Sequence, residues 1–387
     1  MPHESTINRT TKVILTLCGI WPGAWCVIIF RAYWIIALAT DEFCHYRYFL
    51  IHWHTDDVFD LADCLSSFIA QLKLITKFSV FWLNQRKFIK ILTMMAEDWH
   101  DSANNDVSMR ETICKAKLSS RITNAMVTLH ALAIVTYSSG MILADVDTND
   151  GESAPPLLLK VEVPIDIHSQ LRYKVLVTAQ FTYLLIAGCG AGLVNALLLT
   201  LILHVGGQID ILRGWLTELV PGDNEHREKH ESVIAMTKKI IQKHQKIIIF
   251  SKHIEDLYTY ITLVQFASNT LLMCVLGFLT VTSIGNSEAA GVGKSLLFYT
   301  VTTLEAFVFC FAGEYLKNKS KEVGIAAYDS AWYKLKPEIS RILILVILRA
   351  QKQLTLTAGK MMDLSLESFA NIMKASASYM SVMFAMQ

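Results

Sequence analysis

Few residues in this chain have the types and spacing that chemistry requires. EAAGVGKS, at Glu288–Ser295, ends like a phosphate-binding loop, but Glu288 stands where the first glycine is needed. His226 and His230 lie four residues apart in HREKH and could bind a metal from one helix face, although a solvated charged loop is the favoured interpretation. No Ser-His-Asp or Cys-His arrangement has supporting context. The sequence therefore predicts no catalytic site, no metal site and no cofactor.

Glu305 is the most informative isolated charge, because it lies within an apolar segment. An ionisable side chain at membrane depth usually faces the interior of a helix bundle or a cavity. The alternative is that Glu305 lies close enough to the cytoplasmic boundary to pair with Lys73 or Lys77, and the sequence leaves both open. His52 and His54, on the predicted outer side, are expected in a hydrated rim.

The composition itself indicates an integral membrane protein. Of the 387 residues, 53% are hydrophobic and only 18% are charged, which is too apolar for a soluble protein of this length. A net charge of +1 and the lack of a basic run argue against nucleic-acid binding. Most of the eight cysteines fall within or beside apolar segments, so they are expected to be structural thiols.

Seven apolar segments are long enough to cross a bilayer as helices. They cover residues 26–50, 58–82, 122–143, 174–203, 257–283, 296–315 and 364–386. Residues 84–121 and 204–256 are predicted to form amphipathic helices beyond the membrane. Gly188 and Gly192, in the fourth segment, have the four-residue spacing typical of close helix packing. RILILVILR, at Arg341–Arg349, is too short to span and is predicted to lie buried in a cytoplasmic protein core.

The distribution of lysine and arginine predicts the orientation of the chain. Placing the N-terminus and residues 84–121, 204–256 and 317–352 inside the cell collects 25 of the 35 basic residues there. The positive-inside rule then puts the N-terminus in the cytoplasm and, after seven crossings, the C-terminus outside. The expected fold class is an all-α, polytopic membrane protein with seven transmembrane helices and a helical cytoplasmic anchor region.

Polar residues interrupt the last apolar segment along one helical face. Asn371, Lys374, Ser378, Val382 and Met386 recur at steps of three and four residues, so they stack into one stripe. Because a charged group facing lipid costs about 2.5 to 3.5 kcal/mol, such a stripe normally faces partner helices or water. Either the helix packs inside a bundle with Lys374 paired to an acid, or it lines a pore.

This end of the chain resembles the insect odorant receptors. LTAGKMMDLSLESFANIMKASASYMSV, at Leu356–Val382, carries a Ser-Leu pair, a Phe, a Lys and a Ser-x-Ser-Tyr motif in the order typical of that family. The matching positions are Ser365, Leu366, Phe369, Lys374, Ser376, Ser378 and Tyr379. CGIWPG at Cys18–Gly23 and MAEDW at Met95–Trp99 look like the family's other landmarks. Met380 departs from the pattern, which often has an aromatic residue there.

The resemblance implies an odorant receptor, a ligand-gated, non-selective cation channel subunit that forms a heterotetramer with a shared co-receptor. The implied partners are membrane lipid and a small volatile or cuticular chemical, such as an apolar odorant or pheromone. The implied location is the plasma membrane of a sensory neuron dendrite, which the chain would cross several times. Residues 1–316 would form a six-helix transmembrane ligand-binding bundle with cytoplasmic extensions, and residues 317–387 the anchor helix and the pore-lining seventh helix.

Two other classes of membrane protein are alternatives. A seven-helix G-protein-coupled chemoreceptor would have the opposite orientation, and none of the predicted spans contains the proline kinks of that class. A transporter would favour inverted repeats and interrupted helices, which the sequence does not show.

The resemblance also implies where a ligand and a gate would lie. The pocket is expected between the second, third, fourth and sixth spans, where aromatic side chains with one polar tip suit an apolar odorant with a single hydrogen-bonding group. The candidates are Phe68, Ala133, Tyr137, Met141, Phe181, Tyr183, Phe298, Tyr299 and Thr302. Val382 and Met386 are expected to gate the pore by dewetting, with Asn371 and Ser378 lining a wetter path. A ring of four Lys374 side chains would repel cations unless other subunits leave the lumen neutral.

Overall fold

The computed structural model describes residues 7–23, 25–54, 58–143, 157–164, 169–219, 228–285 and 289–385, and these residues are almost entirely helical. The α-helices are α1 (Arg9–Leu17), α2 (Val27–His52), α3 (Val58–Leu83), α4 (Gln85–Ser102), α5 (Asp106–Leu143), α6 (Gln170–Thr217), α7 (Glu228–Gly285), α8 (Ala289–Asp329), α9 (Pro337–Gln351) and α10 (Leu366–Ala385). A short 3₁₀-helix, η1 (Trp332–Lys334), and two strands, β1 (Thr357–Ala358) and β2 (Met362–Asp363), lie between α8 and α10.

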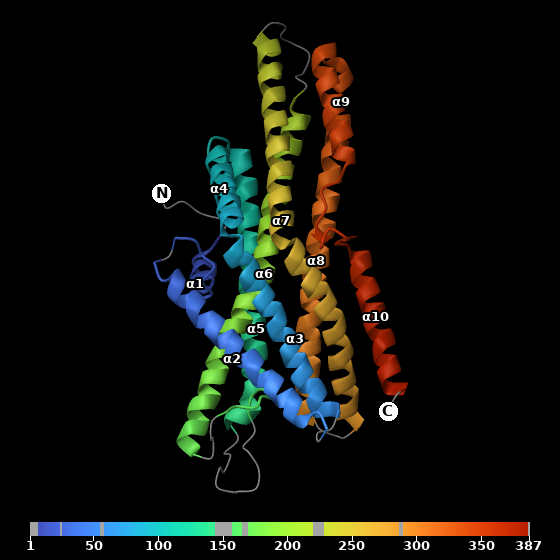
Figure 1. Cartoon of the computed structure of the whole chain (residues 1–387). Helices are drawn as coiled ribbons and strands as arrows, with labels where there is room; N and C mark the ends of the chain where they lie inside the picture. Colours follow the sequence, from blue (N-terminus) through green and yellow to red (C-terminus); the bar gives the residue numbers. More distant parts are fainter. Residues whose placement is uncertain are drawn as a thin grey trace.

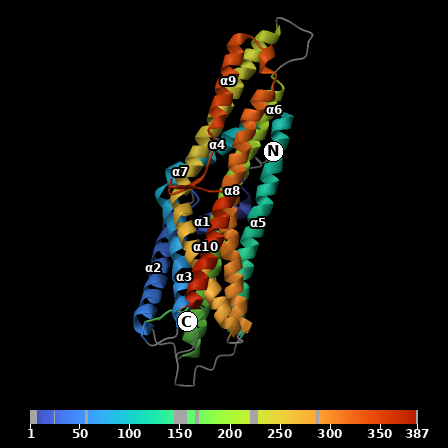
Figure 2. The same cartoon turned by 90° about the vertical axis from the view of Figure 1, so that its right-hand side faces the viewer.

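The helices form a long bundle with two distinct ends (Figure 1). α2, α3 and α10 occupy its lower part in that view, whereas α5, α6, α7 and α8 continue into the upper part, where α4 and α9 lie. Figure 2 shows the same division from the side, with α9 above α10. The end of α2, the start of α3, the end of α7 and the start of α8 all lie at the lower end. The chain therefore reverses direction at this end between α2 and α3 and again between α7 and α8, as successive predicted spans require.

Four stretches of the described residues are long and apolar enough to cross a membrane by length and composition alone. They are Asp106–Ser139, Gln170–Thr217, Ser232–Gly285 and Gly291–Lys334, and they contain most of the predicted third to sixth spans. The predicted first, second and seventh spans correspond to α2, α3 and α10. Each of these three helices carries charged residues within it, such as Asp41 in α2, Lys77 in α3 and Lys374 in α10.

One end of each predicted span from the third to the sixth lies well inside a longer helix. α7 is 58 residues long, which corresponds to about 87 Å at 1.5 Å per residue, compared with about 30 Å for a hydrocarbon core. Residues 228–276 contain no glycine or proline, so the helix passes from its charged part into its apolar part without a break. Hydropathy therefore marks where lipid contact would end, but not where the helix ends.

α6 lies at the centre of the main hydrophobic core. Leu193, Leu197 and Leu201 are at most 1% exposed. Gly188 and Gly192 face α5, because a Cβ atom at Gly188 would overlap Ile134 and one at Gly192 would overlap the His130 ring. The missing side chains let the two helices approach closely, which confirms the packing predicted from the glycine spacing. All eight cysteines are free thiols.

A buried carboxylate joins three helices in the upper part of the bundle. Asp98, in the MAEDW stretch of α4, is 3% exposed. Its oxygens lie 3.1 Å from His204 Nε2 of α6, and 3.0 and 3.2 Å from the ammonium groups of Lys243 and Lys246 of α7. Burial acts to raise the pKa of Asp98, but the His204 hydrogen bond and the two lysine charges outweigh it and hold the pKa well below its usual range.

A small hairpin that the sequence analysis did not predict leads into α10. Thr357 pairs with Asp363 and Ala358 with Met362, across a turn in which Gly359 and Lys360 both have positive φ angles. That geometry is typical of a tight type I′ turn and favours glycine. The Gly359 amide donates to the Thr259 carbonyl at 2.9 Å, which fixes the hairpin on α7.

α9 contains the RILILVILR stretch, and one of its faces is buried against other described residues. Leu343 is fully buried and Val346 is 6% exposed, whereas Leu345 and Leu348 are 64% and 54% exposed. One face of α9 is therefore buried in a protein core, as predicted, and the opposite face is exposed. Its other face is an aliphatic strip that the described part of the chain leaves exposed.

Candidate functional site

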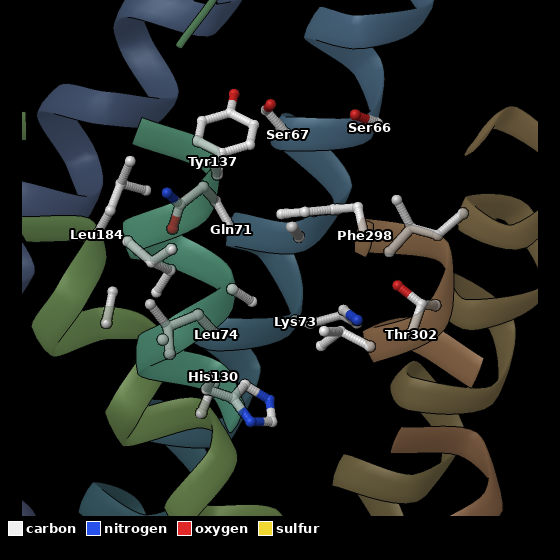
Figure 3. Close-up of a pocket in the computed structure, with 18 of the residues that line it drawn as sticks. Ser66, Ser67, Gln71, Lys73, Leu74, His130, Tyr137, Leu184, Phe298 and Thr302 are labelled. Carbon is white, nitrogen blue, oxygen red and sulfur yellow. The ribbon is translucent and has the colours of Figure 1, made fainter. Parts of the chain in front are cut away.

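A cavity of about 150 Å³ lies between α3, α5, α6, α7 and α8. Figure 3 shows side chains from these helices converging on it, with Tyr137 and Ser67 at one end, His130 at the other and Phe298 between them. Its middle is apolar and is formed mainly by Leu74, Ile134, Leu184, Leu276, Phe298 and Val301. An apolar body with polar groups at the ends is the usual chemistry of a small-molecule site.

The outer end of the cavity, toward the α2–α3 end of the bundle, holds a paired lysine. Lys294 Nζ lies 2.8 Å from Asp63 Oδ2 and 4.7 Å from the centre of the Tyr137 ring. The Tyr137 hydroxyl donates to the Leu158 carbonyl at 2.8 Å, and its ring is 6.0 Å from that of Phe298. These contacts fix the ring of Tyr137 as a wall of the cavity.

The inner end of the cavity is lined by Lys73, Lys77, His130 and Glu305, which we call the basic floor. Glu305 Oε2 accepts a hydrogen bond from Lys73 at 2.8 Å, and Oε1 lies 3.6 Å from both Lys77 Nζ and His130 Nε2. Two amide side chains complete the carboxylate's shell, since Asn195 donates to Oε1 at 2.9 Å and Gln265 to Oε2 at 2.7 Å. Five helices therefore meet at one buried carboxylate.

The two sequence-based alternatives for Glu305 both describe part of this arrangement. The side chain is 5% exposed and borders the cavity, as expected for an ionisable residue at membrane depth. It also pairs with Lys73 and Lys77, because the four-residue spacing of these lysines puts both on one face of α3.

Four of the nine candidate ligand residues line the cavity: Ala133, Tyr137, Phe298 and Thr302. Tyr183 lies behind the lining, where its hydroxyl donates to Gln71 Oε1 at 3.1 Å and its ring contacts Trp34. The other four are not in the described lining. Phe181 packs against a satellite core near Leu158 and Tyr299 packs between two core clusters, while Phe68 is half-buried on α3 and the side chain of Met141 lies outside the described residues. Their roles in binding remain predictions.

The polar lining was the part of the site that the sequence analysis missed. Gln71, His130 and the pair of Asp63 with Lys294 all border the cavity, and none was among the candidates. The available signal was the presence of polar residues within apolar helical segments, which usually face a bundle interior. The metal interpretation of His226 and His230 falls on residues whose side chains are not described, and the described residues contain no cluster suited to a metal ion.

The predicted stripe on α10 is exposed in the single chain. Asn371, Lys374 and Ser378 are exposed and Val382 is 56% exposed, while Met386 lies outside the described residues. The opposite face of the helix is packed against α7 and α8. There, Ile372 and Ser376 are 7% and 3% exposed, and the Phe369 ring lies 5.7 Å from that of Phe307 in α8.

Met380, the departure from the expected pattern, has a place on the packed face of α10. Its sulfur lies against Gly277 of α7, at a position that a Cβ atom on Gly277 would overlap. The glycine therefore provides the notch that receives the methionine side chain.

The helix bundle has the architecture of a seven-helix membrane protein. The 7tm Odorant receptor family model matches residues 57–377, so the chain belongs to this family. Odorant receptor 13a of Drosophila melanogaster is 25% identical over 417 aligned residues, which cover 99% of this chain and 96% of that relative. Odorant receptor 10 of Aedes albopictus is 31% identical over 176 residues, a match that covers 46% of each protein.

A solved structure shares the whole fold. The insect olfactory receptor OR5 from Machilis hrabei, solved in complex with eugenol, aligns with a TM-score of 0.79 over 98% of this chain and 97% of that one, at 13% identity. The match confirms the all-α, seven-helix membrane fold. Because the identity is low, the match supports the arrangement of helices and not the chemistry of the site.

Proposed function

We propose that this chain is a subunit of a ligand-gated cation channel that detects a small odorant or pheromone. The cavity would bind the ligand, and α10 would line the pore in a heterotetramer with a co-receptor. The N-terminus would lie in the cytoplasm and the C-terminus outside, in the plasma membrane of a sensory neuron dendrite. A receptor of this kind needs no catalytic site.

The observation that carries this proposal is that the same two helices wall the cavity and support α10. Leu272 and Leu276 of α7 and Phe298 of α8 border the cavity. On α10, Ser376 donates to the Thr270 carbonyl of α7 at 3.4 Å, and Met380 lies against Gly277. A ligand that moves α7 or α8 would therefore move α10 as well, because packed interfaces transmit small shifts.

Cysteine accessibility tests the pore role with a matched pair on one helix. Ser378 is exposed on the stripe and Ser376 is buried on the packed face. In chains expressed with the co-receptor, a charged thiol reagent should change the current of Ser378→Cys and leave Ser376→Cys unaffected. Equal resistance of both positions in open and closed channels would show that α10 does not line the pore.

Two further substitutions test the gate and the charge of the stripe. Val382→Ser should raise the current without ligand, because a polar ring no longer dewets. Lys374→Glu should increase calcium permeability relative to sodium.

Antibody labelling of intact cells tests the orientation. An antibody that reaches an N-terminal epitope on intact cells would contradict the predicted orientation and favour a G-protein-coupled receptor.

A further inference from the structure

The charges of the basic floor do not balance. Lys73 and Lys77 share one carboxylate, Glu305, which is the only acidic side chain paired with either lysine among the described residues. Lys77 is 1% exposed, and its ammonium lies 3.6 Å from Glu305 Oε1, beyond the length of a good hydrogen bond. One buried positive charge is thus in excess even before any protonation of His130, whose Nε2 has no hydrogen-bond partner in the described part of the chain.

The other charged pair of the cavity cannot supply the missing negative charge. Asp63 borders the outer end and is already paired with Lys294. An uncompensated buried ion costs several kcal/mol, so a buried ammonium is stabilised by an anion that enters its site. Because Lys77 lines the cavity, that anion can come from a ligand.

We infer that the cavity binds carboxylic acids, with the carboxylate on the basic floor beside Lys77 and the hydrocarbon part along the apolar middle. This inference rests on the proposed role of the cavity as the ligand site. A carboxylic acid is ionised at neutral pH, and a hydrogen bond between an ammonium and a carboxylate is about twice as strong as a neutral one. A small inorganic anion such as chloride offers the same charge, and the experiment separates the two sources.

The size of the cavity limits the hydrocarbon part. An apolar cavity of about 150 Å³ holds a molecule the size of benzene, and the volume here is the same. Leu74, Ile134 and Phe298 would contact a short chain or a single ring. Hexanoate fits this description, and two neutral compounds of similar size, methyl pentanoate and 1-hexanol, lack its charge.

The first test compares these three probes on the wild-type chain expressed with its co-receptor. The half-activating concentration of hexanoate should be at least about tenfold lower than that of either neutral probe, because one charged hydrogen bond contributes a factor of about ten or more in affinity. An equal or stronger response to the neutral probes would overturn the inference and leave the proposed channel function standing.

Two variants of the basic floor provide a second test, because one removes a positive charge and the other removes the negative charge. Lys77→Met removes the excess charge and should lower the ratio of hexanoate to methyl pentanoate sensitivity by at least about tenfold. Glu305→Gln removes the shared carboxylate and should raise that ratio. Lys90→Met, an exposed lysine on α4, is the control for loss of a positive charge outside the cavity and should keep the wild-type ratio. A ratio unchanged in both floor variants would overturn the inference.

A binding measurement on purified receptor depends neither on surface expression nor on channel opening. Hexanoate should raise the unfolding temperature of the purified wild-type receptor more than methyl pentanoate does, because a ligand that binds only the folded state stabilises it. Stabilisation by chloride with none by hexanoate would overturn the carboxylic-acid assignment. If no compound in a broad panel evokes current but hexanoate stabilises the receptor, the proposed channel function fails and the anion site stands.

Discussion

At the scale of single residues, two buried carboxylates each face two lysines and a histidine, but their charges balance differently. Lys73 and Lys77 have only Glu305 as an acidic partner among the described residues. At Asp98, Lys243 is paired with the carboxylate, and the second lysine, Lys246, is also paired with Glu97 and Asp101. Asp98 lies on α4 and its partners on α6 and α7, so it connects helices that are far apart in the sequence. We therefore expect Asp98 to stabilise the fold and Glu305 to affect ligand choice.

The first prediction concerns Asp98. Asp98→Asn should lower the free energy of unfolding by about 3 to 5 kcal/mol, because it leaves Lys243 buried without a counter-charge. Thermal unfolding of purified protein measures this. Asp101→Asn, on the same helix but 61% exposed at its side chain, should cost less than about 1 kcal/mol. Similar losses for the two variants would contradict the structural role of Asp98.

The pH dependence of this contribution follows from the lowered pKa of Asp98. A carboxylate whose folded pKa is depressed contributes stability that is complete above its unfolded pKa, about 3.9, and is lost as pH falls through the lower folded pKa. The difference between wild type and Asp98→Asn should therefore be constant from pH 5 upward and shrink only in strong acid. A difference that disappears near pH 6 would contradict this assignment to the Asp98 carboxylate.

The second prediction concerns the wall of the cavity. Tyr137→Ala should change the rank order of active compounds, by about tenfold or more for those that touch the ring, while surface expression is kept. Tyr299, the next aromatic candidate on α8, lies outside the lining. Tyr299→Ala tests the remaining candidate: a changed rank order would support its predicted role at the ligand, and a parallel shift of all dose–response curves would mark it as core. A parallel loss for Tyr137→Ala, matched by lost surface protein, would mark Tyr137 as core.

At the scale of elements, the entry into α10 depends on close contact between backbones. Gly313 of α8 lies against the backbone carbonyl of Leu364, which follows the β1–β2 hairpin. The hairpin is in turn anchored on α7 through Thr262, whose hydroxyl donates to the Thr357 carbonyl at 2.9 Å. α7 and α8 thus determine where α10 begins as well as how it packs.

The third prediction uses this glycine. Gly313→Ala should impair gating or surface expression, because its Cβ atom would overlap backbone atoms of Leu364 that cannot move aside without shifting α10. Gly214→Ala, in α6 with open space around it, is the matched control and should be neutral or stabilising by up to about 1 kcal/mol. Current amplitude normalised to surface protein compares them. Normal surface protein together with normal current in Gly313→Ala would mean that this contact is dispensable.

At the scale of the whole molecule, two of the faces that the described residues leave exposed have the chemistry of contacts with other subunits. One is the polar stripe of α10, and the other is the aliphatic strip of α9 that includes Leu345 and Leu348. Exposed apolar strips of this kind usually mark contacts with other proteins. Both faces are accounted for if several subunits surround one axis.

The fourth prediction tests the strip on α9. Leu345→Asp should abolish assembly with the co-receptor, because it places a charge in an apolar interface, and loss of co-purification measures this. Arg341→Asp puts the same acid at an exposed, already polar position of α9 and should leave assembly intact. Unchanged co-purification of Leu345→Asp would exclude this strip as the interface.

The sequence by itself determined the class of protein and the order of its helices. Apolar length and the lysine and arginine bias are properties of short segments, so they predict spans and orientation without knowledge of contacts. The spacing of Gly188 and Gly192 predicted a close helix contact for the same reason, and that contact is confirmed.

Only the tertiary structure decided which side chains share the cavity. Whether His130 and Lys77 meet Glu305 depends on the rotation and relative height of three helices, and a shift of one residue turns a helix by about 100°. Phe68 and Phe181 had suitable chemistry for a ligand site and still lie outside the described lining. The charge balance of the basic floor is likewise a property of three helices packed together, and no single segment of the sequence contains it.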